Sequence, residues 1–332
     1  MTLDVSKKLR IAQIGVGYWG PNLLRNCVAN KRCEVVKVAE LLEERRDFVN
    51  RLYPSIITVE SAESIISDDC IDAVIVATPA TTHFDLTMKL LESGKHVLVE
   101  KPMAKTVTEI EEIEAKAIDK QRVVMVGHTF VYNDAVRYLK ELVDGGELGD
   151  VRYIHCHRLN LGRIRTDIDA LWNLAPHDVS IIQYLLGDPE PESVVTEGMS
   201  YVHENIDDVS FMHIQYSGKV MAHIHVSWLD PRKVRCMTVV GSKKMVVYDD
   251  ISENKIAIYD KGIDRKNIKK KMEFDDRPFY YAHRSGDVVM PKIDFREPLE
   301  TEIAHFIDCI ENGTPCLTGP GHAKKVVRIL ST

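Results

Sequence analysis

A glutamate and a lysine stand together at the end of a strand-like run, residues 96–99, where they could take part in acid–base chemistry. The run continues into Glu100 and Lys101, and Pro102 then redirects the chain rigidly. A lysine at such a strand end can donate a hydrogen bond to a carbonyl oxygen or to a developing alkoxide. A neighbouring cofactor and the exclusion of water from the site would shift the pKa of the amine. A solvated Glu–Lys pair is the simpler alternative, and the neighbouring motifs argue against it.

A second candidate group is the pair formed by Asn173 and His177. The two lie four residues apart, so they share one face of a predicted helix, residues 173–186. Histidine is the natural proton carrier near neutral pH. On the sequence alone, a structural role for His177 is as consistent as a catalytic one, and both interpretations stay open.

The elements that would position these residues begin with an apolar run, residues 9–15, which breaks into a glycine-rich turn. In a dinucleotide-binding turn the first glycine allows the bend, the second lets the backbone approach a pyrophosphate, and the third lets helix and strand pack closely. The following helix would direct its free N–H groups toward the phosphates. A second predicted strand, residues 34–40, ends in an acid suited to the adenosine ribose hydroxyls. The cofactor candidates here are Gly15, Gly17, Tyr18, Trp19, Gly20 and Glu40.

More cofactor contacts are expected where a central strand, residues 73–77, ends. This run is apolar on both faces, which is typical of a strand in a covered parallel sheet. Ligands of open α/β sheets bind beyond the carboxyl ends of the strands, so the residues that follow are placed to line a nicotinamide site. A surface position for His83 is the alternative. The cofactor candidates at these strand ends are Thr78, Pro79, His83, Glu100 and Lys101.

The periodicity divides the chain into two parts. Alternating strand and helix patterns over residues 1–127 predict an N-terminal Rossmann domain, a doubly wound parallel sheet. Residues 128–332 change to long alternating segments joined by short turns, which predict an α+β domain with a large open, mainly antiparallel sheet for substrate binding and oligomerisation. The final helix, about residues 320–332, is a candidate to pack back on the first domain. The expected fold class is α/β.

The predicted antiparallel strands carry apolar residues on both faces, as residues 209–216 and 219–228 illustrate. The domain's own helices can cover only one face, and a large uncovered apolar patch usually marks an interface. Closed symmetry favours a dimer or a dimer of dimers. We therefore expect a homodimer or homotetramer joined through this sheet.

Composition narrows the partners and the compartment. A net charge of −7 argues against nucleic-acid binding, and no apolar run approaches the roughly 18 residues of a membrane span. The N-terminus lacks the apolar core of a signal peptide, and the seven scattered cysteines suit reduced thiols, so a cytoplasmic protein is expected. The pairs His155-x-His157 and His223-x-His225 lack a completing acid or cysteine, and no metal site is expected.

Several of these motifs occur together in one known family. The glycine turn, Ala77-Thr-Pro79, Glu100-Lys101-Pro102, the junction Gly127-His-Thr-Phe-x-Tyr-Asn133 and the helical His177 resemble the Gfo/Idh/MocA (glucose–fructose oxidoreductase and inositol dehydrogenase) family over nearly the whole chain. The resemblance implies NAD(P)-linked redox chemistry at a sugar or cyclitol carbon. It also implies Lys101 and His177 as the catalytic residues, with Lys101 touching the nicotinamide ribose. Many members carry Asp where this chain has Asn173, which puts a proton relay through that position in doubt. The substrate-binding candidates are Lys101, His128, Asn133, Arg163, Asn173 and His177.

Within that family, residues 15–22 and 158–165 look most like members that act on nucleotide-linked sugars. Arg163 and Arg165 could hold a diphosphate, since guanidinium suits bidentate phosphate contact, and a solvated loop is the alternative. The leading hypothesis is an NAD(H)-dependent dehydrogenase of a nucleotide-linked hexose in polysaccharide or deoxysugar biosynthesis. NADP(H) is less favoured, because Glu40 would repel a 2′-phosphate. A free-polyol dehydrogenase of the inositol type and a catalytically silent dinucleotide-binding regulator are the alternatives.

Overall fold

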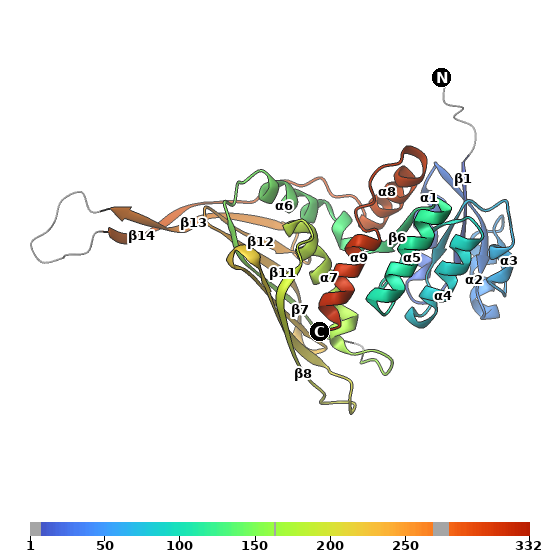
Figure 1. Cartoon of the computed structure of the whole chain (residues 1–332), viewed down its shortest axis with the longest axis horizontal. Coiled ribbons are helices and arrows are strands. Elements are labelled where there is room, and N and C mark those ends of the chain that lie inside the picture. The colour runs from blue at the N-terminus through green and yellow to red at the C-terminus, as the bar shows by residue number, and fades with distance from the viewer. Residues whose placement is uncertain (1–7, 163, 268–278) are drawn as a thin grey trace, which may run out of the picture. The chain divides into compact units, whose positions relative to one another are not determined.

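The computed structural model describes residues 8–162, 164–267 and 279–332, and the chain forms two compact units (Figure 1). The first unit comprises the residues up to Asn133 together with Arg296–Ser331. The second unit comprises Asp134–Phe295 and Thr332. Among the described residues, no helix has both the length and the apolar composition needed to cross a membrane.

The boundaries of the units differ from the expected division into residues 1–127 and 128–332. Two late helices, α8 (Pro298–Asn312) and α9 (Pro320–Leu330), belong to the first unit. Helix α8 packs against α1 (Gly20–Ala29) and against the short 3-10 turn Thr129–Tyr132, and α9 packs against the helix that precedes the last strand of this unit. The apolar face of α8 therefore finds its partners far back in the sequence, which position along the chain does not indicate, whereas the return of α9 to the first unit agrees with the expectation for the final helix.

The first unit is built on a six-stranded parallel sheet in the order β3-β2-β1-β4-β5-β6. Its strands are β1 (Leu9–Ile14), β2 (Cys33–Ala39), β3 (Ile57–Val59), β4 (Ala73–Val76), β5 (His96–Glu100) and β6 (Val124–Gly127). Its other helices are α2 (Glu43–Leu52), α3 (Glu63–Ile66), α4 (His83–Glu92) and α5 (Val107–Lys120). The strand order reverses between β1 and β4, and ligands of such sheets bind at that switch point, outside the carboxyl ends of the strands.

Local sequence explains the central elements of this unit. All four residues of β4 are buried, as expected for a strand covered on both faces. Helix α5 begins with a capping box: the Thr106 hydroxyl accepts from the Glu109 N–H at 3.2 Å, and the Glu109 carboxylate accepts from the Thr106 N–H at 3.0 Å. The short elements β3 and α3 were not predicted, because three or four residues carry too little periodicity.

The second unit contains an eight-stranded sheet in the order β14-β13-β12-β11-β7-β10-β9-β8, in which β7 and β10 are parallel and the other pairs antiparallel. Its strands are β7 (Val151–Leu161), β8 (Pro191–Met199), β9 (Val209–Tyr216), β10 (Val220–Ser227), β11 (Leu229–Gly241), β12 (Met245–Asp249), β13 (Ile256–Asn267) and β14 (Phe279–Val289). Its helices are α6 (Asp134–Asp144) and α7 (Ala170–Leu186). The predicted α/β fold class, with a Rossmann sheet and a mainly antiparallel sheet, is confirmed.

The two faces of this second sheet differ. Ala222, Ile224 and Val226 of β10 are fully buried, and α7 packs over this side of β7, β9 and β10. The opposite face carries side chains with substantial exposure, including Met221 at 51% and Phe211 at 40%. We call this the histidine face; it consists of Tyr153, His155, His157, Phe211, His213, Met221, His223 and His225.

The histidine face is more polar than the sequence analysis expected for a sheet apolar on both sides. Neighbouring strands bring its imidazoles together: His223 pairs with His155 on one side and with His213 on the other, where the ring centroids are 4.5 Å apart. Phe211 stacks on His225 at 4.2 Å. The alternating histidines make this face partly polar, while Met221 and Phe211 supply exposed apolar surface on it.

Candidate functional site

The turn after β1 contains three glycines, and the steric environment of a side chain would differ at each of them. Gly15 has a φ of +93°, and a Cβ there would lie 2.6 Å from the Ala77 carbonyl oxygen. A Cβ at Gly20 would lie 2.6 Å from the Gly15 carbonyl oxygen. A Cβ at Gly17 would meet, among the described atoms, only an Arg45 side-chain nitrogen at 3.7 Å. The fold therefore requires Gly15 and Gly20, whereas the missing side chain of Gly17 leaves room for a ligand that approaches the backbone.

An acid and two aromatic residues border this turn. The Glu40 carboxylate, at the end of β2, accepts from the Val16 N–H at 2.7 Å and from the Leu42 N–H at 3.1 Å. These bonds fix the acid beside the turn, where a dinucleotide fold places its ribose-binding carboxylate. Tyr18 is 91% exposed and Trp19 is 39% exposed, so both aromatic rings are accessible next to the α1 N-terminus.

The loops after β4 and β5 are tied together by His83. Its Nδ1 lies 2.7 Å from the Pro102 carbonyl oxygen and its Nε2 lies 2.9 Å from the Thr78 carbonyl oxygen. The ring is buried, and burial lowers its pKa. The Thr78 hydroxyl also lies 2.7 Å from the Thr82 hydroxyl, and Pro79 begins the short turn between them. Cofactor contact by His83 stays a prediction, and the structure gives its ring nitrogens partners within the fold, so the ring positions both loops.

Glu100 and Lys101 leave β5 at the same edge of the sheet. The Glu100 carboxylate accepts from the Lys101 N–H at 3.2 Å, and it packs on Gly127 of β6, where a Cβ would lie 3.1 Å from Glu100 Oε1. Burial raises the pKa of the Glu100 carboxyl to about 7, against the opposing effect of the Lys101 charge. A group with this pKa is partly protonated at neutral pH, so the local charge beside Lys101 changes within the physiological range.

Helix α8 adds an acid that the sequence analysis missed. Glu302 is fully buried and accepts from the Thr129 hydroxyl at 2.9 Å. Burial, followed by the charge of Glu100, raises the pKa of Glu302 well above its ordinary value, which favours its protonated form. A signal was present, because the spacing of Leu299, Glu302 and Ile303 puts the acid on the apolar stripe of the helix.

His128 and Asn133, both substrate-binding candidates, lie at the end of β6 and just beyond it. They are 2% and 1% exposed. The His128 ring meets the His322 ring edge-on, with centroids 5.4 Å apart, and burial lowers the pKa of His128 well below its ordinary value. A neutral, buried imidazole of this kind suits a role in shaping the sheet edge, and substrate contact by these two residues stays a prediction.

In the second unit, α7 presents Asn173 and His177 one turn apart. The helix begins at Asp169, whose carboxylate accepts from the Trp172 N–H at 2.7 Å. Both Asn173 and His177 are partly exposed, in a helix that is otherwise largely buried. The helix therefore offers these two polar groups at its accessible side.

A buried ion pair fixes the orientation of α7 on the sheet. Arg158 of β7 donates to both carboxylate oxygens of Asp178, at 2.8 and 2.9 Å, and both side chains are 6% exposed. Asp178 follows His177 directly, so the ion pair sets the rotation of the helix that carries the imidazole. The sequence analysis did not single out this pair, since its partners are 20 residues apart.

The proposed diphosphate-binding arginines are less informative. Arg163 lies outside the described residues. Arg165 donates to both carboxylate oxygens of Asp167, at 2.9 and 2.6 Å, and its side chain is 44% exposed. This pairing favours the alternative interpretation of Arg165 as part of a solvated loop.

The structure thus groups the candidates in two sets. The glycine turn, Glu40 and the loops after β4, β5 and β6 share one sheet edge of the first unit, and Asn173 and His177 lie in the second. Two family models match the chain, one described as an oxidoreductase family with an NAD-binding Rossmann fold, over residues 9–128, and one as the GFO/IDH/MocA C-terminal domain, over residues 136–247. The chain belongs to the Gfo/Idh/MocA family of oxidoreductases.

The relatives of this chain include inositol dehydrogenases and hydratases of 2,7-anhydro-N-acetylneuraminate, and the chain spans less than two thirds of the length of several of them. The chain is 28% identical to scyllo-inositol 2-dehydrogenase (NADP(+)) of Bacillus subtilis, over 57% of this chain and 55% of that enzyme. It is 25% identical to the NAD(+) scyllo-inositol 2-dehydrogenase of the same organism, over 94% of this chain and 89% of the enzyme. Among solved structures, UDP-N-acetylglucosamine 3-dehydrogenase from Acidithiobacillus ferrooxidans superimposes with a TM-score of 0.80 at 22% identity, over 98% of this chain and 96% of that one, which shows a shared fold.

Proposed function

We propose that this oxidoreductase is an NAD(H)-dependent dehydrogenase that interconverts a ring hydroxyl and a ketone of a sugar. The observation that carries the proposal is the shared sheet edge of the first unit. There, the space left by Gly17 adjoins an acid suited to ribose, and the end of β5 supplies Lys101. These residues fit a dinucleotide, because Gly17 leaves a cradle that a Cβ would fill.

The chemistry requires a hydride and a proton to leave the alcohol. The bound nicotinamide would accept the hydride, which leaves the protein to handle the oxygen and its proton. In our proposal the Lys101 ammonium stabilises negative charge on the oxygen, His177 accepts the hydroxyl proton, and Asn173 orients the ring by hydrogen bonds. Asn173 cannot relay a proton as an Asp would, so in this proposal the proton depends on His177 and the charge on the oxygen depends on Lys101.

The substrate we propose is a nucleotide-linked hexose, in polysaccharide or deoxysugar biosynthesis. The structural likeness to a UDP-N-acetylglucosamine dehydrogenase supports this class at the level of the fold. Binding energy from the nucleotide would hold the reacting carbon in place. A free polyol is the second candidate, and it is favoured by the two scyllo-inositol dehydrogenases among the relatives. A silent regulator is disfavoured, because Lys101 and His177 are both present.

A substrate panel tests this assignment. We expect reduction of NAD(+) in the presence of one or more UDP- or dTDP-linked hexoses. The reduction is monitored by the absorbance of NADH. A response to free inositols alone would replace the nucleotide sugar with the polyol. Cofactor binding in a thermal-shift assay with no turnover on any panel member would favour the regulator.

The cofactor preference is tested separately. Glu40 supports NAD(H), whereas Arg45, whose guanidinium lies 3.9 Å from the Glu40 carboxylate, could attract a 2′-phosphate. We expect kcat/KM to be higher with NAD(H) than with NADP(H). Glu40→Ala should reduce the ratio of these two kcat/KM values. Arg45→Ala is the matched control. It should lower kcat/KM with NADP(H) and leave kcat/KM with NAD(H) unchanged. A higher kcat/KM with NADP(H) in the unmodified protein would refute the assignment.

The proposed enzyme is cytoplasmic and associates as a homodimer or homotetramer through the histidine face.

A further inference from the structure

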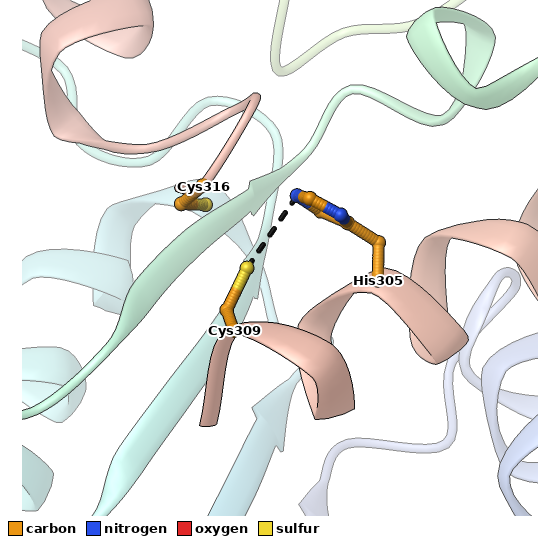
Figure 2. Close-up of side chains that lie close together, drawn as sticks. All are labelled: His305, Cys309 and Cys316. Carbon is orange, nitrogen blue, oxygen red and sulfur yellow. Dashed lines mark hydrogen bonds between the residues drawn. The ribbon is translucent and has the colours of Figure 1, made fainter. Parts of the chain in front are cut away.

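Three side chains near the end of α8 gather into a group that the proposed dehydrogenase chemistry does not use. His305 and Cys309 lie one turn apart on α8, and Cys316 follows after the chain turns at Gly313, which has a φ of +66°. One ligand atom from each of the three lies within 4.8 Å of the others. Figure 2 shows the histidine and Cys309 rising from adjacent turns of the helix, with Cys316 on the returning segment.

The separation of one donor pair matches that of a tetrahedral metal site. The Cys309 Sγ lies 3.4 Å from the His305 Nε2. In a zinc site, bonds of about 2.1 Å to nitrogen and 2.3 Å to sulfur at tetrahedral angles put such a pair about 3.6 Å apart. Two thiols and one imidazole, with no carboxylate among them, form a donor set that prefers thiophilic ions such as Zn²⁺.

The hydrogen bond at His305 identifies the ring nitrogen that could bind an ion. The Leu317 backbone N–H donates to His305 Nε2 at 3.1 Å, so this nitrogen carries a lone pair and no proton. The Tyr132 ring packs on the imidazole with centroids 5.4 Å apart, which restricts the rotation of the imidazole. On metal binding, Nε2 would exchange its bond with the Leu317 amide for a bond to the ion.

The segment that carries Cys316 is held against the sheet from the other side. The Val126 N–H of β6 donates to the Thr318 carbonyl at 2.9 Å, and the Thr318 hydroxyl donates to the Val126 carbonyl at 2.8 Å. The Tyr132 hydroxyl lies 2.8 Å from the same threonine oxygen. Both sides of the group are therefore anchored, which lowers the cost of ordering the ligands when an ion binds.

We propose that His305, Cys309 and Cys316 form a Zn²⁺ site, with water as the fourth ligand. Binding releases the two thiol protons and forms two Zn–S bonds and one Zn–N bond. Cys309 is buried while His305 and Cys316 are partly exposed, so the ion has a route to the site. The ion joins α8 to the segment beside β6 and stabilises the first unit, whatever substrate the enzyme uses.

Metal analysis of the whole protein tests the site directly. The protein is stripped with chelator under a reducing agent, exposed to Zn²⁺, and passed through a desalting column. We expect about one zinc per chain by mass spectrometry of the metal, and a rise in the midpoint of thermal unfolding of about 5 °C at a hundredfold excess over Kd. With Co²⁺ instead, thiolate-to-cobalt charge-transfer absorption and tetrahedral d–d bands should appear.

Variants then assign the ligands. Cys316→Ser and His305→Gln should each weaken Zn²⁺ binding at least about tenfold and remove or weaken the cobalt bands. Cys70→Ser, which replaces an exposed cysteine elsewhere in the first unit, is the matched control and should bind as the unmodified protein does. If a site variant fails to fold, the cobalt titration of the unmodified protein still decides. The proposal would be overturned if the Co²⁺-loaded protein showed no thiolate-to-cobalt charge-transfer absorption. A Cys309–Cys316 disulfide in protein kept under a reducing agent would also overturn it.

Discussion

The two sheets of this protein are covered in different ways, and each leaves a different part free. The parallel sheet of the first unit has a fully buried central strand, β4, so its carboxyl edge is the place where side chains become available. The antiparallel sheet of the second unit buries one face under α7 and leaves the histidine face open. This difference underlies our proposal that the first sheet supplies chemistry at an edge and the second supplies association over a face.

Loss of the lysine at the edge of the first sheet should have the largest effect. We expect Lys101→Ala to lower kcat by about two to four orders of magnitude, the range for a positioned acid–base group, while Kd for the dinucleotide changes far less. Steady-state kinetics and cofactor titration measure the two quantities. Lys105→Ala, at an exposed position in the following loop, is the control and should leave kcat unchanged. Near-normal turnover of Lys101→Ala would reduce Lys101 to a cofactor contact.

The two faces of the second sheet should respond differently to the same kind of truncation. Ile224 is fully buried, so Ile224→Ala should lower the free energy of unfolding by about 2–5 kcal/mol. Met221 lies on the same strand but on the histidine face, and Met221→Ala should cost under about 0.5 kcal/mol in the isolated chain. Urea unfolding of dilute protein measures both. Equal losses would mean that the histidine face is covered within one chain.

The glycine turn offers a smaller and more selective effect. Because a Cβ at Gly17 meets little of the fold, Gly17→Ala should leave thermal stability nearly unchanged and weaken dinucleotide binding by about 10- to 100-fold. Gly20→Ala should instead destabilise the first unit, since its Cβ would lie 2.6 Å from a carbonyl oxygen. Calorimetric titration with NADH and thermal unfolding separate the two outcomes. Full cofactor affinity in Gly17→Ala would remove the main support for the proposed binding site.

Acid should weaken association through the histidine face. Burial, and then neighbouring imidazoles, lowers the pKa of His155 and of His223, and burial lowers that of His225. The folded chain therefore binds fewer protons than the unfolded one. Above the ordinary histidine pKa of about 6.5 these histidines do not lower the free energy of unfolding, and as the pH falls below that value the free energy of unfolding decreases. Association dries these rings further, and we expect the dimer Kd to rise about tenfold between pH 7.5 and pH 5.5.

Sedimentation at several pH values checks this expectation. The double variant His223→Gln, His225→Gln should flatten the pH dependence. His203→Gln, at an exposed position outside the histidine face, should leave it unchanged. A strictly monomeric mass at micromolar concentration and pH 7.5 would contradict association through this face.

Local pattern predicted much of the fold, and tertiary contact decided the rest. The limits of β9 agree with the predicted residues 209–216, because strict alternation marks both ends of a strand. Helix α8 falls within residues 128–332, which were expected to form the second domain, but it belongs to the first unit, since an amphipathic stripe shows that a partner exists without showing which one.

The candidate site shows the same limit. The placement of the glycine turn and of the end of β5 at one sheet edge was predictable, because a local sequence pattern marks each of these strand ends. The partners of His83, and the group formed by His305 and Cys316, depend on which loops the fold brings together. The roles of Lys101 and His177 stay predictions, which the substitutions above test.

The interrupted first unit has a consequence for synthesis of the protein. Strand β6 is the last strand at its side of the sheet, and its Val126 N–H bonds to Thr318. On the ribosome, residues 134–295 emerge before Thr318 does, so the nascent chain carries an open β-edge throughout that interval. Open edges recruit other strands, including those of neighbouring nascent chains. All six strands of the parallel sheet are therefore made early, but the β6 edge is covered only after residues 134–295 have been synthesised.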